Sequence, residues 1–264
     1  MTWEFTDLEF KVLCNRYRQG AIPSPLTYTS RTMDADEYRR QLLGAEVELD
    51  LRLDAEFRAV FEAVCNPEVF VGVHGWHDAD IENPAKHVMV HGARRGRRAC
   101  LLIQHPGETT MHSGGVTMID CEPEELARLL VAQLPEVEAG GSAPIPIATE
   151  PSAPDPYEAP RASAFDSFEE SVDSRSLRFL STPADQTGAM RILQGRSKYG
   201  PRGVAVSTLV WRDLPGDGRY LIDLDPEAKS AVGVDSRRFA EHIDGAIAQI
   251  LMHMESRGEQ QEFV

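Results

Sequence analysis

The chain has 264 residues, enough for one large domain or two small ones with a sizeable core. It carries 42 Asp and Glu against 27 Lys and Arg, which gives a formal net charge of -15 at pH 7. Because such a surface repels phosphate backbones and anionic lipids, binding to nucleic acid or to membrane surfaces is disfavoured. We interpret the acidity mainly as a source of solubility.

The N-terminus lacks the basic start and apolar run of a signal peptide, and no stretch of about 18 apolar residues is present to span a membrane. The cysteines Cys14, Cys65, Cys100 and Cys121 are far apart, with apolar neighbours and no C-x-x-C pair. This spacing favours buried thiols over disulfides or a zinc knuckle. We therefore expect a cytoplasmic protein without membrane insertion.

The chain begins with a predicted strand over residues 3–5 and a helix. Thr6 and Glu9 fit a capping box at the start of this helix, which is expected to end near Arg18, before Gly20. Two more helices follow in the prediction, one opened by acidic residues and one marked by an apolar stripe. They cover residues 34–48 and 57–64.

The hydrophobic period then changes from helical spacing to two, which predicts a meander of strands. An acidic loop over residues 77–85 follows the first strand, and an arginine-rich turn over residues 94–98 joins the second strand to the third. The expected strands are residues 69–76, 86–93, 99–105 and 115–119. Pro123 then opens a helix with an apolar leucine face that extends to Leu134.

Residues 135–163 are rich in proline and poor in long apolar side chains, which predicts a linker or exposed loop. After it, Phe165, Phe168 and Val172 suggest a helix, and residues 182–185 suggest the start of another that ends near Gly195. Strands are expected over residues 204–212, 219–224 and 231–234. The final helix is capped by Asp235 and carries a long apolar stripe.

Both halves of the chain therefore contain helices, an antiparallel meander and one amphipathic helix. This repetition predicts an α+β, quasi-two-fold duplicated fold with a central antiparallel sheet flanked by N- and C-terminal helical bundles. The chain is expected to form a single domain built of two similar halves, residues 1–134 and 164–256, joined by the proline-rich linker 135–163.

Six of the eight histidines lie between His74 and His112, and His87 and His91 share one face of a predicted strand. Zinc would need three or four converging ligands, and no H-E-x-x-H motif is present. We interpret these histidines as half-exposed strand residues. A metal-binding enzyme that uses the histidine-rich strands 74–112 remains an alternative.

The remaining motifs do not identify a catalytic site. Residues 78–83 resemble the start of a calcium loop but have Asn83 where the loop needs glycine. The basic, glycine-rich segment 195–203 precedes a strand, whereas a phosphate loop follows one and precedes a helix. Neither G-x-S-x-G nor Ser-x-x-Lys occurs. The sequence therefore predicts a protein without enzymatic activity, metal or cofactor.

Short segments along the chain resemble the EspG family, the cytosolic chaperones of actinobacterial type VII (ESX) secretion systems. The resemblance lies in residues 5–13 (FTDLEFKVL), 200–206 (GPRGVAV) and 218–221 (GRYL), followed by the terminal amphipathic helix. It covers nearly the whole chain in the order of elements. The proline-rich insert and the dense histidines depart from the pattern.

The resemblance implies that the chain binds the exposed apolar tip of the PPE subunit in PE–PPE heterodimers, or related secreted helical-hairpin proteins. It would keep these substrates soluble and direct them to their secretion system. Such a protein needs a partly open apolar sheet face with a polar rim and aromatic anchors. Our candidate partner-binding residues are Trp76, Asp78, Asp80, Tyr199, Arg202, Ser207, Leu209, Trp211 and Tyr220. For each apolar residue among them the alternative is a place in the core. A homodimer is a further expectation to be tested by mass in solution.

Overall fold

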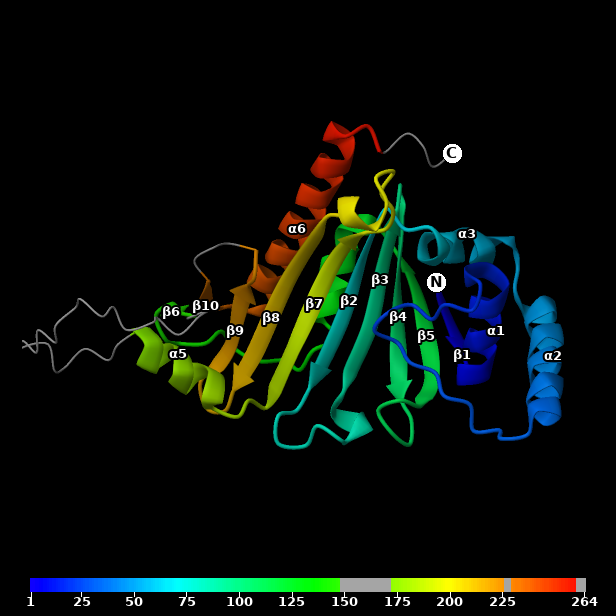
Figure 1. Cartoon of the computed structure of the whole chain (residues 1–264), viewed down its shortest axis with the longest axis horizontal. Coiled ribbons are helices and arrows are strands. Elements are labelled where there is room, and N and C mark those ends of the chain that lie inside the picture. The colour runs from blue at the N-terminus through cyan, green and yellow to red at the C-terminus, as the bar shows by residue number, and fades with distance from the viewer. Residues whose placement is uncertain (148–171, 226–228, 260–264) are drawn as a thin grey trace, which may run out of the picture.

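The computed structural model describes residues 1–147, 172–225 and 229–259. These residues form one ten-stranded sheet in which neighbouring strands are antiparallel, in the order β1-β5-β4-β3-β2-β7-β8-β9-β10-β6 (Figure 1). The strands are β1 (Thr2–Phe5), β2 (Val69–Trp76), β3 (Val88–Arg95), β4 (Arg98–Pro106), β5 (Ser113–Cys121), β6 (Ile145–Pro146), β7 (Gln186–Gln194), β8 (Val206–Leu214), β9 (Gly218–Asp223) and β10 (Ser230–Gly233).

From either edge of the sheet to its middle, equivalent strands of the two halves follow in the same order: a short edge strand, then the last to the first strand of a meander. A short strand, β1 or β6, forms each edge and pairs with the last strand of a meander, β5 or β10. The first strands of the two meanders, β2 and β7, pair with each other in the middle over eight residues. The sheet is therefore quasi-two-fold about the β2–β7 pair, and the predicted α+β fold class is confirmed. The division of the chain at residues 134 and 164 stays a prediction.

Six α-helices are present in the described residues, and the predicted caps explain where several of them start. Thr6 and Glu9 form the expected capping box, and Asp34, Asp54 and Asp235 each accept a hydrogen bond from a first-turn amide. The helices are α1 (Asp7–Arg18), α2 (Ala35–Arg52), α3 (Ala55–Cys65), α4 (Leu126–Val131), α5 (Val172–Ser181) and α6 (Ser236–Ser256).

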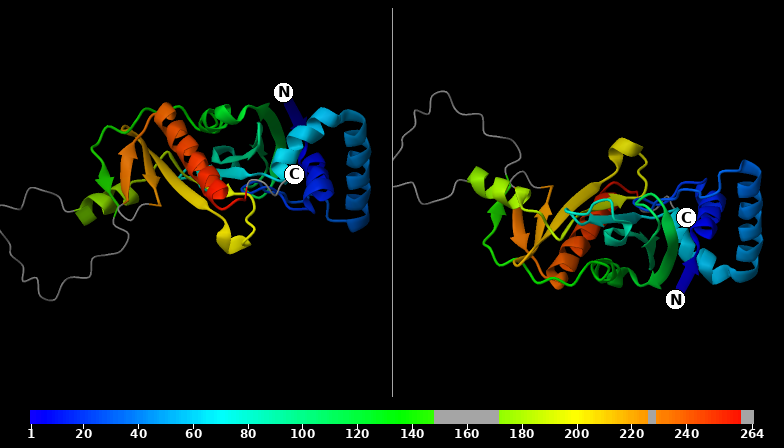
Figure 2. Two further views of the ribbon diagram at one scale, coloured as in Figure 1. Left: turned by 90° about the horizontal axis from the view of Figure 1, so that it is seen from above. Right: turned by 90° about the horizontal axis from the view of Figure 1, so that it is seen from below.

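The helices cover the two faces of the sheet differently. On one face α4 and α6 pack together over the apolar side chains of the central strands, with Trp211, Phe239 and Leu101 fully buried between them. On the opposite face α1–α3 cover one end of the sheet, and α5 covers β9 and β10 at the other end. Figure 2 shows α1–α3 and α5 at opposite ends of the molecule.

The segment 182–195 differs from its prediction, because it forms strand β7 instead of a helix. Thr182-Pro183-Ala184-Asp185 resembles a helix start but serves as the connection between α5 and β7. Pairing with β2 on one side and β8 on the other supplies two ladders of backbone hydrogen bonds, and this outweighs the low strand propensity of glycine, alanine and glutamine.

Residues 135–147, predicted as the start of a linker, run along the sheet instead. The amide of Arg219 donates to the carbonyl of Glu138 at 2.8 Å, and the amide of Gly140 donates to the carbonyl of Arg219 at 2.9 Å. Ile145–Pro146 then forms the edge strand β6 on β10. The remainder of the predicted linker, and Phe165 and Phe168 of the predicted helix, lie outside the described residues.

The helix predicted from Pro123 is shorter than expected. It consists of a 3₁₀ turn, Pro123–Glu125, followed by α4, which ends at Val131. Across the described part of the chain, no helix is long and apolar enough to cross a lipid bilayer.

Candidate functional site

The middle of the sheet carries no described helix on the face opposite α4 and α6. Apart from the buried Arg212, the side chains of β2, β7 and β8 that point to this face are half-buried or exposed, whereas their strand neighbours on the α6 face, such as Val71 and Met190, are buried. We call this surface the open strip. Its residues are Phe70, His74, Trp76, Thr187, Ala189, Arg191, Leu193, Val206, Thr208 and Val210, while the loop at Ser24 and Pro25 lies over Gly72 of the same face.

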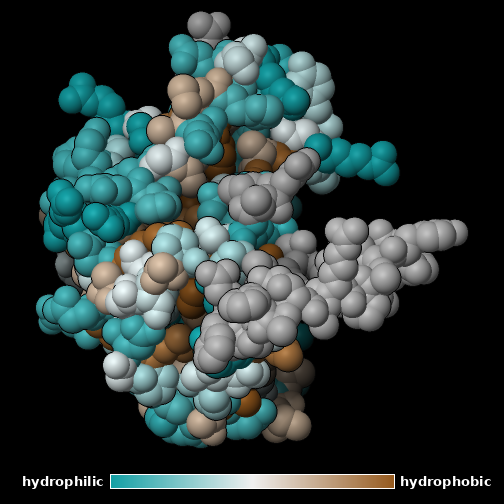
Figure 3. Space-filling model, turned by 90° about the vertical axis from the view of Figure 1, so that its left-hand side faces the viewer, coloured by the Kyte–Doolittle hydropathy of each residue, from teal (hydrophilic) through white to brown (hydrophobic). Residues whose placement is uncertain are grey.

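The open strip is mainly apolar and is arranged in cross-strand rows. One row is Phe70, Leu193 and Val206, and Val206 is 45% exposed. Figure 3 views the molecule from the α5 end, where hydrophobic residues lie in recesses between hydrophilic ones. An apolar surface bounded by polar residues is typical of a protein-binding site.

Trp76, a predicted partner-binding residue, lies at the end of the strip where β2 stops. Its ring is half-buried and contacts His74, with ring centroids 5.3 Å apart. Nε2 of His74 lies 3.2 Å from Nδ1 of His87, whose Nε2 lies 2.7 Å from the carbonyl of Ile81. One tautomer of each ring satisfies both contacts, because each Nε2–H then donates. Burial, with a smaller effect of His87, lowers the pKa of His74.

Asp78 joins the loop after β2 to α5 and β8. Its Oδ2 accepts from Nη2 of Arg212 at 2.9 Å and from the amide of Ala184 at 2.9 Å, and Arg212 also donates to the carbonyls of Phe179 and Thr182. Burial would raise the pKa of Asp78, but the Ala184 amide, the Thr187 hydroxyl and Arg212 outweigh it and lower the pKa. Asp78 is therefore occupied within the fold and fixes the border of the strip.

Asp80 is also bound within its own loop. Its Oδ2 accepts from Nδ2 of Asn83 at 2.9 Å and lies 3.1 Å from Nζ of Lys86. These two contacts lower the pKa of the exposed Asp80 carboxyl. Asp80 therefore keeps its negative charge at the rim of the strip and forms part of the polar border.

Tyr199 and Arg202 lie in the loop that joins β7 to β8, beyond the other end of the strip. Both are exposed, and the Tyr199 ring has two cations 5.4 Å from its centroid, Nζ of Lys198 and the guanidinium of Arg257. Arg202 lies in a single 3₁₀ turn, Pro201–Gly203. These two residues remain accessible to a partner.

The structure corrects the expected exposure of four candidates. Ser207, Leu209 and Trp211 point to the face that α6 covers, and their side chains are buried. Tyr220 points to the opposite face, where α5 covers it and Phe179 contacts its ring edge-on at 5.4 Å. Trp211 and Tyr220 belong to the core, whereas the buried Ser207 and Leu209 still line a groove beside α6. A role of these four residues in partner binding stays a prediction.

Sequence reasoning missed Phe70, Arg191, Leu193 and Val206. The signal was present in residues 186–194, where buried and more exposed side chains alternate along the strand. The helix predicted there hides Arg191 and Leu193. Phe70 and Val206 lie in predicted strands, and only the pairing of β7 between β2 and β8 brings them onto one surface.

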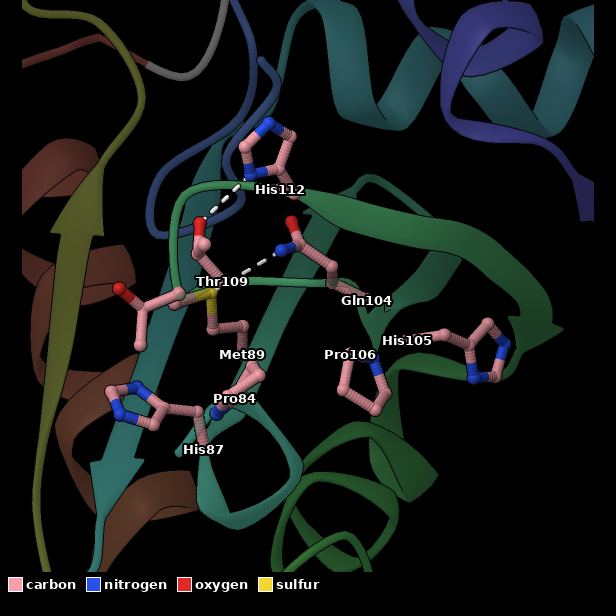
Figure 4. Close-up of a pocket in the computed structure, with 9 residues that line it drawn as sticks. Pro84, His87, Met89, Gln104, His105, Pro106, Thr109 and His112 are labelled. Atoms are coloured by element: carbon pink, nitrogen blue, oxygen red, sulfur yellow. Dashed lines mark hydrogen bonds between the residues drawn. The ribbon is translucent and has the colours of Figure 1, made fainter. Parts of the chain in front are cut away.

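The histidines do not gather into a metal site. Figure 4 shows His87, His105 and His112 around the contact between Gln104 and Met89, with His105 pointing away from it. His112 is hydrogen bonded to Thr109 at 2.8 Å, and His105 to Thr117 at 2.7 Å. Within residues 1–147, 172–225 and 229–259, no three His, Cys, Asp or Glu side chains are placed to hold a metal ion.

Comparison with known proteins gives two findings. The model of the EspG family matches residues 6–245. Among solved structures, the chain is similar to the Mycobacterium tuberculosis type VII secretion system chaperone EspG5, whose structure was determined in complex with the PE25–PPE41 dimer. The match has a TM-score of 0.57 at 12% identity and covers 94% of this chain and 96% of that one, so it concerns the fold. No curated protein matches the chain.

Proposed function

The chain belongs to the EspG family, and from this premise we propose that it is a cytosolic chaperone of PE–PPE heterodimers. It binds the exposed apolar tip of the PPE subunit, keeps the pair soluble and directs it to a type VII secretion system. The bound complex of the structurally similar EspG5 supports the choice of partner.

The observation that carries the proposal is the open strip. Covering an apolar helical tip is favourable because it removes apolar surface from water, and a half-buried sheet surface with polar borders offers the tip an apolar face. Trp76 and Phe70 provide aromatic side chains, which are favoured anchors at protein interfaces. Asp80 and Arg202 lie at the borders, where polar contacts set orientation.

The proposal is tested by co-expressing the chain with each PE–PPE pair encoded in the same genome and separating the products by gel filtration. We expect one pair or more to co-elute with the wild-type chain. Val206→Glu places a charge on the open strip and should abolish co-elution, and Trp76→Ala should weaken it. Both effects follow from burying a charge or removing an anchor at the interface.

Val232→Glu is the matched control, because Val232 is also an exposed strand valine, on β10 and outside the strip. It should co-elute like the wild-type chain. If no pair co-elutes with the wild-type chain, the proposed function is wrong. If Val206→Glu and Trp76→Ala bind normally, the partner uses another surface.

A further inference from the structure

The open strip has one exposed charged side chain near its centre, that of Arg191. Its cross-strand neighbours are Gly72 on β2 and Thr208 on β8, neither of which is charged. Its neighbours on the same face of β7 are Ala189 and Leu193. Ser24 and Pro25 lie over Gly72, and none of these neighbours carries a charge.

Arg191 differs from the other arginine of this region. Arg212, which lies on β8 opposite Thr187, is neutralised by Asp78 and donates to two backbone carbonyls. For Arg191, no ion pair or hydrogen bond to another described side chain is formed. The acidic residues at the border, Asp78 and Asp80, are already engaged with Arg212 and Lys86.

A partner that covers the strip removes water from Arg191. A buried cation without a counter-charge is strongly destabilising, and a carboxylate that meets the guanidinium with two parallel hydrogen bonds relieves this cost. In an otherwise apolar contact, such a pair also fixes the register of the two proteins. The strip therefore binds an apolar segment well only if that segment carries a negative charge opposite Arg191.

We propose that Arg191 is a specificity-determining residue of the open strip and that the docked segment carries an Asp or Glu side chain within its apolar surface. This inference rests on the proposed function and adds the chemistry by which the chain selects its PPE partner.

The experiment measures the dissociation constant of the purified chain for a co-eluting PE–PPE pair at two salt concentrations. Arg191→Gln should weaken binding roughly tenfold and Arg191→Glu roughly a hundredfold, with Arg191→Lys between Gln and the wild type. Salt should weaken binding less for Arg191→Gln than for the wild type, because an ion pair is screened. Arg97→Glu, at the exposed turn between β3 and β4, is the control and should bind like the wild type.

Charge exchange then identifies the partner group. Each acidic residue of the PPE tip is changed to lysine, and one such variant should restore binding to Arg191→Glu while losing affinity for the wild-type chain. Normal binding by Arg191→Glu, or rescue by none of the lysine variants, would overturn the inference. The proposed function would still stand if Val206→Glu blocks the complex. Failure of the wild-type chain to bind any pair would overturn the proposed function first. Circular dichroism confirms that each variant is folded.

Discussion

His91 lies beside the open strip and is fully buried, with one ring nitrogen engaged and one without a partner. Its Nδ1–H donates to the carbonyl of Ser24 at 2.8 Å, its ring stacks on Phe70, and its Nε2 has no hydrogen bond. Burial, aided by the positive charge of Arg18 and opposed by the Ser24 hydrogen bond, lowers the pKa of His91 to about 4. The imidazole is therefore neutral in the folded protein.

This pKa predicts a pH dependence of stability. The unfolded chain takes up a proton at His91 below about pH 6.5, whereas the folded chain resists protonation until about pH 4. The contribution of neutral His91 to the free energy of unfolding is about 3 kcal/mol. It is complete above pH 6.5 and is lost as the pH falls toward 4. The free energy of unfolding is measured in urea from pH 7 to pH 4 for the wild type and for His91→Asn. The difference between the two proteins should shrink by this amount as the pH falls, because only the wild type carries the His91 contribution.

His105→Asn serves as the control for loss of an exposed imidazole, and its curve should run parallel to that of the wild type. If His91→Asn also runs parallel, His91 is accessible to protons in the folded state. The sequence placed His91 on a strand face with His87 but gave no sign that the loop at Ser24 covers it, because that contact joins residues distant in the chain.

At the scale of single elements, Trp211 of β8 occupies a slot made by two glycines on neighbouring strands. Gly75 of β2 and Gly188 of β7 are paired in register, and Gly188 also pairs with Trp211. A Cβ added at Gly188 would lie 2.2 Å from the indole ring and 2.6 Å from the carbonyl of His74. The indole therefore needs glycine at this point of β7.

Gly188→Ala should destabilise the protein by about 3 kcal/mol, because the added Cβ would overlap the fully buried indole and the backbone of β2. Gly44→Ala is the matched control on α2, where a Cβ meets nothing within 4 Å. It should stabilise the protein by about 1 kcal/mol through the higher helix propensity of alanine. Denaturant midpoints measure both. Equal stability of Gly188→Ala and the wild type would mean that Trp211 packs elsewhere.

Local signals predicted the elements that carry such signals. The capping box of Thr6 and Glu9, the cap of Asp235 with its apolar stripe, and the strands of the first meander agree with the structure to within a few residues. The helix predicted where β7 lies is wrong, because this segment becomes a strand through its pairing with β2 and β8, and no local pattern shows that pairing. The same error hid Arg191 and Leu193, whereas Trp76 could be placed because β2 alternates clearly.

At the scale of the whole molecule, one core connects both halves of the chain. The cluster under α4 and α6 contains Val71, Val90 and Leu101 from the first meander together with Met190 and Trp211 from the second. Opening either half would expose this cluster and break the β2–β7 pair. We therefore propose that the two halves unfold together as one domain.

Single-tryptophan variants test this cooperativity. Trp3 reports on β1 and the cluster under α1–α3, and Trp211 reports on the central core. For each variant, the denaturant midpoint from tryptophan fluorescence should equal the midpoint from far-ultraviolet circular dichroism of the same variant. Two separate transitions, with Trp3 unfolding independently of Trp211, would show that the halves are distinct domains.

The central β2–β7 pair also constrains how the protein is made. A ribosome completes β2 at Trp76, but β7 begins only at Gln186, and α6 follows after that. At about 5–20 residues per second, the nascent first half waits on the order of ten seconds with an eight-residue strand edge unpaired and its apolar face without α6. A protein that we propose to shield apolar surface on its clients thus exposes apolar surface of its own while it is being synthesised.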